Sequence, residues 1–325
     1  MLELLSPAGS MEALRAAVQN GANAVYLGYD RFNARMGAQN FSADELQEAI
    51  VYCHVRGVQV HLTLNTLVSD REMARAAEVI RAAAVFGVDA FIVQDLGMVQ
   101  LCKEIAPSVP VHASTQMSIH SLEGVVAAAE LGCSRVVLSR ELPMEQIRHI
   151  CRRSPVEIEV FVHGALCMCY SGQCYLSSVI GRRSGNRGQC AQPCRLAYGY
   201  GRFEATRYPL SLKDNCLIEH VRELERMGVA SVKIEGRMKR PEYVAVVTKA
   251  YRAAIDGRRV TENDMQQLEA VFSRQGFTQG YYEGKTGQSM FGTRQEPEDN
   301  RELFSAARAH VYALNERLPD GVGQK

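Results

Sequence analysis

Five cysteines gather in one short stretch of the sequence, where their spacing can hold a metal centre. They lie in H-G-A-L-C-M-C-Y-S-G-Q-C and G-Q-C-A-Q-P-C-R, as Cys167, Cys169, Cys174, Cys190 and Cys194, and Cys216 follows in S-L-K-D-N-C. Thiolates are soft ligands that suit iron–sulfur clusters and zinc. The spacing matches neither the C-x₂-C pair of zinc ribbons nor the cysteine run of bacterial ferredoxins. The residues therefore predict a metal centre on a loop and leave iron–sulfur and zinc open.

Alternating apolar strands and amphipathic helices must position this loop. Strands are predicted at Glu3–Leu5, Ala24–Gly28, Gln59–Asn65, Ala90–Asp95, Pro110–Gln116, Arg135–Glu141, Glu157–Gly164 and Ala230–Arg237. Helices are predicted near 10–19, 43–56, 70–85, 96–106, 120–131, 143–152, 216–228 and 241–256. Eight strand–helix units predict a (β/α)₈ TIM-like barrel. A doubly wound open sheet is the rival fold, but no G-x-G-x-x-G follows the first strand.

Polar residues recur on one face of the predicted strands. Residues two apart share a face, and such sets are His61, Thr63 and Asn65; His112, Ser114 and Gln116; Glu159, Phe161 and His163; and Lys233, Glu235 and Arg237. The apolar face can pack under the outer helices, which leaves the polar set at the barrel axis. Buried polar groups are costly unless they are paired or functional. The pattern therefore predicts a ligand-binding barrel mouth, with a self-satisfied polar network as the alternative.

Charged residues near the strand ends indicate what this mouth binds. Arg140, Lys233 and Arg237, with His163, can hold a carboxylate through charge-assisted hydrogen bonds. Three histidines on these faces, at positions 61, 112 and 163, are also compatible with a zinc site that activates water, although neutral core histidines are commoner. No H-E-x-x-H or G-x-S-x-G occurs, so the residues alone give no hydrolase signature.

The predicted domain organisation has three parts. Residues 1–257 form the barrel, including a cysteine-rich insertion at 165–212 with a hairpin whose strands lie near 195–203 and 206–212. Residues 258–294 form a C-terminal extension that packs on the barrel, with a helix near 262–274. Residues 295–325 are charged and are predicted to be a tail or the start of a truncated further domain. Long insertions in compact domains are usually functional or disordered, and the cysteine density favours order around a metal.

Composition limits the class of protein. The chain has 325 residues, of which 46% are hydrophobic and 22% charged, with a net charge of +1. No apolar run approaches the roughly 20 residues that span a membrane, and no signal peptide is recognisable, so we expect a cytoplasmic protein without membrane contact. In that compartment cysteines are more often metal-binding or catalytic than disulfide-bonded. Cys53, Cys102, Cys133 and Cys151, in or beside predicted helices, are expected to be plain core residues.

The stretch E-V-F-V-H-G-A-L-C-M-C-Y-S-G-Q-C-Y-L-S resembles the signature of the collagenase-like peptidase family U32. The likeness continues through L-L-S-P-A-G, A-V-Y-L-G, H-A-S-T-Q, L-S-R-E-L, G-Q-C-A-Q-P-C-R, S-L-K-D and K-I-E-G-R-M-K, over about residues 1–292. The family was named for a collagen-degrading activity without assigned catalytic residues. It includes RNA- and quinone-modifying hydroxylation proteins with an oxygen-sensitive [4Fe–4S] cluster, some dependent on prephenate. The chain is similar to the branch of 23S rRNA 5-hydroxycytidine synthases and tRNA 5-hydroxyuridine synthases.

The resemblance implies the ligands of that cluster. Cys167, Cys174 and Cys190 match cysteines that bind the cluster in the family. Cys216 is the best match for the fourth ligand, and Cys194 is the second candidate because a C-x₃-C pair also occurs in relatives. This branch normally continues into a second large domain, so the resemblance leaves RNA recognition by this chain open.

We therefore expect an iron–sulfur enzyme that hydroxylates a pyrimidine base of rRNA or tRNA, with prephenate as co-substrate. Arg140, Lys233 and Arg237 would orient the anionic metabolite, with Asn65 and Gln116 beside them. The candidates for proton transfer are Glu159, His163 and Glu235. The expected partners are RNA and the small anion. Two alternatives stay open: a collagenase-like peptidase of unassigned mechanism, and a non-catalytic subunit that assembles with a partner in a hydroxylation complex such as that of the quinone pathway.

Overall fold

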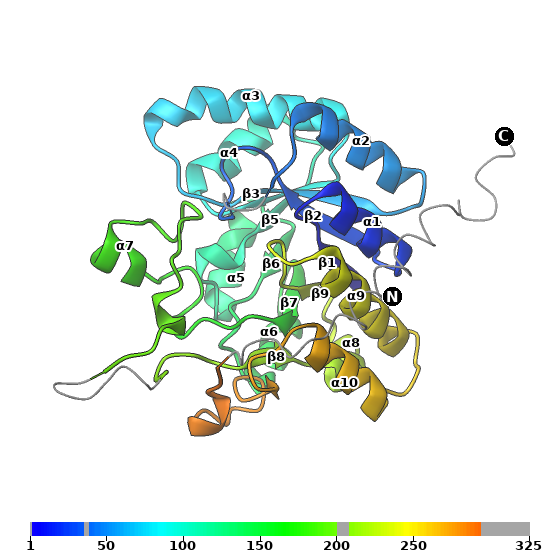
Figure 1. The fold of residues 1–325 in the computed structure, drawn as a ribbon. Coiled ribbons are helices and arrows are strands. Elements are labelled where there is room, and N and C mark those ends of the chain that lie inside the picture. Colours follow the sequence, from blue (N-terminus) through cyan, green and yellow to red (C-terminus); the bar gives the residue numbers. More distant parts are fainter. Residues whose placement is uncertain (1, 36–38, 200–207, 294–325) are drawn as a thin grey trace, which may run out of the picture.

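Eight parallel strands close into a barrel in the part of the chain that the computed structural model describes, residues 2–35, 39–199 and 208–293 (Figure 1). The strands are β1 (Glu3–Pro7), β2 (Ala24–Gly28), β3 (Gln59–Leu64), β4 (Ala90–Val93), β5 (Val111–Ala113), β6 (Arg135–Val137), β7 (Glu157–Gly164) and β9 (Ser231–Ile234). Each pairs in parallel with the next, and β9 pairs with both β7 and β1. This closure confirms the predicted barrel and excludes the open sheet.

Helices connect successive strands and cover the outside of the barrel. They are α1 (Met11–Gln19), α2 (Ala43–His54), α3 (Asp70–Phe86), α4 (Leu96–Ile105), α5 (Leu122–Glu130), α6 (Met144–Cys151), α8 (Val221–Met227) and α9 (Pro241–Ile255). The sequence sets their ends locally: Ser42 and Glu45 form a capping box at the start of α2, and Gly87 ends α3 in the left-handed conformation with φ 94°. Among the helices of the described residues, none combines the length and apolarity needed to span a lipid bilayer.

Several barrel strands end earlier than predicted, because polar residues at their ends cap the next helix. The Asp95 carboxylate accepts a hydrogen bond from the Met98 backbone N–H at 3.0 Å and so begins α4. The Ser114 hydroxyl accepts one from the Gln116 N–H at 3.2 Å and begins the 3₁₀ turn η1 (Thr115–Met117). Side-chain oxygens at these positions satisfy the free N–H groups of a helix start. The predicted strand residues 94–95 and 114–116 are therefore caps and turns.

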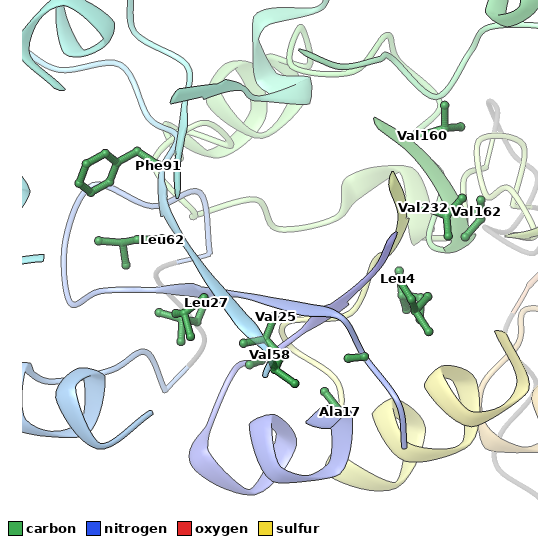
Figure 2. Packing of buried hydrophobic residues seen from close by; sticks show 14 of the residues in the cluster. Leu4, Ala17, Val25, Leu27, Val58, Leu62, Phe91, Val160, Val162 and Val232 are labelled. Carbon is green, nitrogen blue, oxygen red and sulfur yellow. The ribbon is translucent and has the colours of Figure 1, made fainter. Parts of the chain in front are cut away.

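The main hydrophobic core lies between the barrel wall and the outer helices. Figure 2 shows Leu4, Val25, Leu62, Val160 and Val232 directed away from the barrel axis, with Ala17 of α1 packed nearby. All of these side chains are buried. One face of each strand is therefore used for packing, as the alternation predicts, and the opposite face lines the interior.

The chain departs from regular alternation after β7. The insertion contains α7 (Leu176–Gly181) and the 3₁₀ turn η2 (Pro193–Arg195), and Figure 1 shows α7 displaced to one side of the barrel. It returns through β8 (Asp214–Cys216), which pairs antiparallel with the end of β7, before the turn η3 (Ile218–His220) leads into α8. Cys216 is thus a strand residue, and the predicted helix start at this residue is wrong. Part of the predicted hairpin, residues 200–207, lies outside the described residues.

The C-terminal extension packs on the barrel. It contains α10 (Glu262–Val271), β10 (Phe277–Thr278) and the 3₁₀ turn η4 (Gln288–Met290). β10 pairs in parallel with β8, and Leu212 forms an isolated antiparallel bridge with Phe291 instead of belonging to a hairpin strand. Tyr282 joins the main core, and its carbonyl accepts a hydrogen bond from the Met144 N–H at 2.8 Å. Residues 295–325 lie outside the described residues.

Candidate functional site

A small cavity with many cationic side chains lies inside the barrel at the C-terminal ends of the strands. Its volume is about 50 Å³. We call it the lumen cavity, and its lining consists of Tyr26, Arg35, Thr63, Asn65, Ile92, Ser114, Thr115, Gln116, Arg140, Phe161, Lys233, Glu235 and Arg237. The structure therefore brings together all five residues predicted to bind the anion. Four of the lining residues are cationic and one is a carboxylate, so the cavity favours an anion.

Arg237 is the cation of this cavity whose charge is least compensated. Its Nη1 donates to Thr63 Oγ1 at 2.8 Å and to Asn33 Oδ1 at 3.4 Å, and both acceptors are neutral. Within the described ranges, no carboxylate forms an ion pair with it. Burial, together with the neighbouring Arg35, lowers the pKa of Arg237 to about 10. A bound carboxylate would reverse that shift and stabilise the site.

Glu235 holds two of the arginines in place. Its Oε2 lies 2.5 Å from Arg140 Nη2, and its Oε1 lies 3.6 Å from Arg35 Nη2. Burial raises the pKa of this carboxyl, but Arg35, Arg140 and Arg237 outweigh burial and bring it to about 2. Glu235 is therefore ionised at neutral pH. Its geometry suits a counter-ion that orients guanidinium groups, and its proposed part in proton transfer stays a prediction.

Arg140 connects the lumen cavity to the insertion. Its Nη1 donates to the Ala165 carbonyl at 2.8 Å, at the first turn of the inserted segment, and its guanidinium carbon lies 4.0 Å from the centre of the Phe161 ring. Its Nε is buried and has no hydrogen-bond partner among the described residues. A buried donor without a partner is costly, so this atom is suited to a ligand oxygen.

Lys233 and Glu159 form a buried pair on the floor of the cavity. Lys233 Nζ lies 2.8 Å from Glu159 Oε1, and Arg135 Nη1 lies 3.3 Å from Glu159 Oε2. The Glu159 side chain is fully buried. Burial lowers the pKa of Lys233, and Lys233 and Arg135 together keep the pKa of Glu159 below its ordinary value against the effect of burial. Both groups lie on the axis as predicted, but the charge of Lys233 is already compensated by Glu159.

His163 does not face the barrel axis, and this prediction is wrong. The pairing of β7 with β9 shifts register between Phe161 and His163, so the alternation of faces is interrupted there. His163 Nδ1 instead lies 3.3 Å from Tyr251 Oη on α9, and its ring contacts that of Phe277. Burial and Lys239 lower its pKa to about 3, so the imidazole is neutral.

The three histidines therefore do not converge on a zinc site, and they agree with the commoner alternative of neutral core histidines. His61 and His112 lie together in the barrel, with ring centroids 5.0 Å apart in an edge-to-face arrangement, while His163 lies outside. Burial lowers the pKa of both His61 and His112. Both are buried, and nearby Arg135 forms ion pairs with Glu3 and Glu157.

Among the charged residues that line the lumen cavity, Arg35 is the one that the sequence interpretation missed. It lies in the loop after β2, and Glu235 raises its pKa most, with Cys167 and Cys190 acting in the same direction against burial. Arg35 therefore lies between the lumen cavity and the cysteine loop. The signal was present in R-F-N-A-R, since loops after barrel strands line the mouth of the barrel. Asn33, in the same loop, accepts from Arg237.

Specific contacts fix the insertion over the barrel mouth. Glu141 Oε1 accepts from the Ser171 N–H at 3.1 Å and from its hydroxyl at 2.9 Å. Arg187 forms two hydrogen bonds of 2.8 Å with the Glu72 carboxylate on α3. Arg187 is thus paired within the protein although its side chain is 40% exposed. Arg182 and Arg183 stay exposed.

The five thiols of the insertion lie near one another, since Cys194 is within electrostatic range of Cys167, Cys174 and Cys190, and Cys169 is within range of Cys167 and Cys174. Cys167, Cys174 and Cys190 are exposed. Burial raises the pKa of Cys194, Arg195 lowers it, and charges on those three cysteines raise it further. Cys190 Sγ accepts a hydrogen bond from the Gln192 N–H at 3.4 Å.

Cys216 lies apart from this group. Its side chain is 1% exposed and belongs to the main core, and its Sγ lies 3.8 Å from Tyr251 Oη. Burial raises the pKa of Cys216 to about 11, and the charge on Glu219 acts in the same direction. The placement differs from the prediction that Cys216 is the fourth ligand, because the pairing of β8 with β7 turns this residue towards α9. Cys194 fits the geometry better.

Thiolates bind both iron–sulfur clusters and zinc, so the cysteine donors are chemically compatible with either. The ligands of a cluster surround an inorganic core and lie further apart than those of a single ion. In the described part of the chain, no group of three or more His, Cys, Asp or Glu residues converges as a single ion requires. Cys53, Cys102 and Cys133 are buried in the main core and Cys151 is half-buried at its edge, as expected.

The chain matches one protein family and is similar to several curated proteins. The model of peptidase family U32 matches residues 9–291. The chain is 35% identical to the tRNA hydroxylation protein P1 of Bacillus subtilis, over 89% of this chain and 73% of that protein. It is 42% identical to the 23S rRNA 5-hydroxycytidine C2501 synthase of Escherichia coli, over 78% of this chain and 39% of that protein. A protein named collagenase from Porphyromonas gingivalis is 38% identical, over 87% of this chain and 74% of its own length.

Among solved structures, the U32 peptidase Mk0906 has a similar fold. The TM-score is 0.51 at 16% sequence identity, and the match covers 73% of this chain and 94% of that one. At this identity the likeness supports the barrel alone and carries no information about the reaction.

Proposed function

This chain belongs to peptidase family U32, and we propose that it hydroxylates a pyrimidine base of rRNA or tRNA with an iron–sulfur cluster as cofactor. The observation that carries the proposal is the similarity to proteins named for tRNA and rRNA hydroxylation, which extends over 78–89% of this chain. The family match, over residues 9–291, includes the barrel mouth and the cysteine loop. Because the chain spans only 39% of the rRNA enzyme, the base and the RNA that it modifies are part of the proposal.

The proposed ligands of a [4Fe–4S] cluster are Cys167, Cys174, Cys190 and Cys194. The exposure of Cys167, Cys174 and Cys190, and their electrostatic range to the half-buried Cys194, support this set. Cys216 is the alternative fourth ligand from the family resemblance, and it would have to leave its contact with Tyr251. When bound, the cluster would supply redox or Lewis-acid chemistry beside the barrel mouth. The chain's own residues bind and orient the organic substrates.

The lumen cavity is proposed to take a carboxylate group of a small anionic co-substrate such as prephenate. The cavity, of about 50 Å³, is small, so it is proposed to take only the carboxylate group of the molecule. Arg237, with neutral partners, and Arg140, with its free Nε, are the proposed contacts. Glu235 would orient Arg140 and Arg35, while Lys233 would contribute charge from the floor.

The test is the content of 5-hydroxypyrimidines in RNA. Total rRNA and tRNA from a strain lacking this gene would be digested and analysed by mass spectrometry, with and without the gene restored. We expect one 5-hydroxypyrimidine to disappear on deletion and to return with the wild-type gene, but not with Cys174→Ser. Unchanged RNA would refute the proposal. Anaerobic purification with iron and sulfide analysis tests the cofactor, and stoichiometric zinc without iron would refute that part.

Peptide hydrolysis is the second candidate, because one relative is named collagenase. Protease-free protein would be incubated with gelatin, with Arg237→Met as the site variant. Cleavage that is lost in this variant, together with unchanged RNA in the deletion strain, would favour the peptidase.

A further inference from the structure

A second and larger cavity adjoins the cysteine loop on the outside of the barrel mouth. Its volume is about 590 Å³, within the range of roughly 300–1,000 Å³ that is usual for small-molecule sites. One wall is formed by α5 and by residues 116–119 before it, and the other wall is formed by the insertion. We call it the rim cavity. Gly124, Ala127 and Ala128 make the α5 wall, and these small side chains leave the space open.

Gln116 connects the rim cavity with the lumen cavity, since it lines both. No hydrogen-bond partner for its side-chain amide is found in the described ranges, while its backbone N–H and carbonyl are both bonded. Gly172 of the insertion packs on the Gln116 carbonyl, where an added Cβ would lie 2.4 Å from the oxygen. The residue is thus held by its backbone and presents a free amide between the two cavities.

Further amides line the rim cavity in fixed orientations. Asn186 Nδ2 donates to Gln94 Oε1 at 2.5 Å, and Gln94 Nε2 donates to the Gln116 carbonyl at 3.2 Å. The Asn186 Oδ1 accepts from the Leu67 N–H at 3.0 Å. Amides offer both donors and acceptors, which is what the edge of a pyrimidine base requires.

The rest of the lining suits the flat faces of a base. Met117, Ile119 and Leu131 give apolar surface inside the cavity. At its edge, Tyr175 is 65% exposed and Leu96 is 58% exposed, although neither is needed there for the core. Exposed apolar side chains around a cavity mark a binding site, and tyrosine rings stack on unpaired bases.

We infer that the rim cavity receives the target pyrimidine, extruded from the RNA strand, with its polar edge at Gln94 and Gln116 and its face against Tyr175. Cys174 also lines this cavity, so the base would lie beside the cysteine loop and one residue away from the lumen cavity. The inference rests on the proposed function, and it adds the place of the base and the residues that recognise it. Enzymes that modify a base commonly take it out of the strand into such a pocket.

The test fills the cavity and leaves the rest of the protein unchanged. Ala127→Phe places a ring in the rim cavity, and Ala74→Phe makes the same change at an exposed helical alanine that does not line it. Two readouts are compared. The first is the 5-hydroxypyrimidine content of RNA in the complemented deletion strain. The second is photocrosslinking of purified protein to a short ribo-oligonucleotide that contains 5-bromouridine or 5-bromocytidine, with the crosslinked peptide identified by mass spectrometry.

We expect Ala127→Phe to lower the modification and the crosslink yield roughly tenfold or more, with Ala74→Phe close to wild type and melting temperature and iron content unchanged in both. Crosslinks should map to the segments around Met117 and Tyr175. Modification by Ala127→Phe at the wild-type level, or crosslinks confined to other segments, would overturn the inference and leave the proposed function intact. Failure of the wild-type gene to restore any 5-hydroxypyrimidine would overturn both.

Discussion

Neutralising Glu235 tests whether the lumen cavity is an anion site. Glu235→Gln removes the carboxylate that pairs with Arg140 at 2.5 Å and with Arg35 at 3.6 Å. Three arginines then share the cavity without a carboxylate on its lining. The variant should therefore be less stable than wild type in the absence of a ligand, and more responsive to an added anion.

The magnitude follows from the pKa of Glu235. Its value of about 2 in the folded protein, against an ordinary 4.5, corresponds to about 3 kcal/mol at neutral pH. Breaking a buried ion pair costs about 3–5 kcal/mol in general, which agrees. For a chain of 325 residues the melting temperature should fall by roughly 4–5 °C. Because the folded pKa is lowered, this stabilisation is present above pH 4.5 and is lost in wild type as the pH falls towards 2.

The assay is thermal unfolding at constant ionic strength, with chloride replaced stepwise by malonate or prephenate. Stabilisation by a ligand grows with its concentration relative to Kd, so the gain in melting temperature should be larger for Glu235→Gln than for wild type. The control is Glu48→Gln, which removes an exposed pair with Arg15 and should change little. An unchanged melting temperature for Glu235→Gln, or the same anion response in all three proteins, would refute the reasoning.

Three further predictions concern the ligands, the buried pair and the misplaced histidine. After anaerobic purification, Cys194→Ser should contain less than half the iron of wild type and Cys216→Ser should match it; the reverse order would restore Cys216 as the fourth ligand. Lys233→Met should lower the free energy of unfolding, measured in urea, by about 3–5 kcal/mol, because Glu159 stays buried with only Arg135. The double variant with Glu159→Gln should recover most of the loss. A double variant that loses as much stability as Lys233→Met alone would show that the two groups are not coupled. The folded pKa of His163 is lowered to about 3 from an ordinary 6.5, so its burial stabilises the protein above pH 6.5 and this contribution is lost as the pH falls towards 3. His163→Phe should therefore show a shallower loss of stability between pH 6.5 and pH 4, and parallel curves would contradict the assignment.

Local patterns in the sequence were sufficient to predict the barrel, because the alternation of apolar and polar residues along a strand and the caps at helix ends depend on neighbouring residues. The same alternation correctly assigned Lys233, Glu235 and Arg237 opposite the apolar residues of β9. It also located the cysteine loop, since an insertion is visible as a gap between regular units. The assignment of ligands to the cluster and the functional roles stay predictions.

Distances between separate segments could be decided only by the tertiary structure. A register shift in β7 moves His163 from the axis to the core, and no residue type signals that shift. The antiparallel pairing of β8 buries Cys216 against Tyr251, whereas η2 keeps Cys194 among the other thiols. The rim cavity exists because small side chains of α5 face an insertion some fifty residues later in the chain. The sequence thus determined which chemical groups this protein has and on which elements they lie, while the three-dimensional packing decided which of them meet, because strand register and loop placement are set by contacts between residues far apart in the chain.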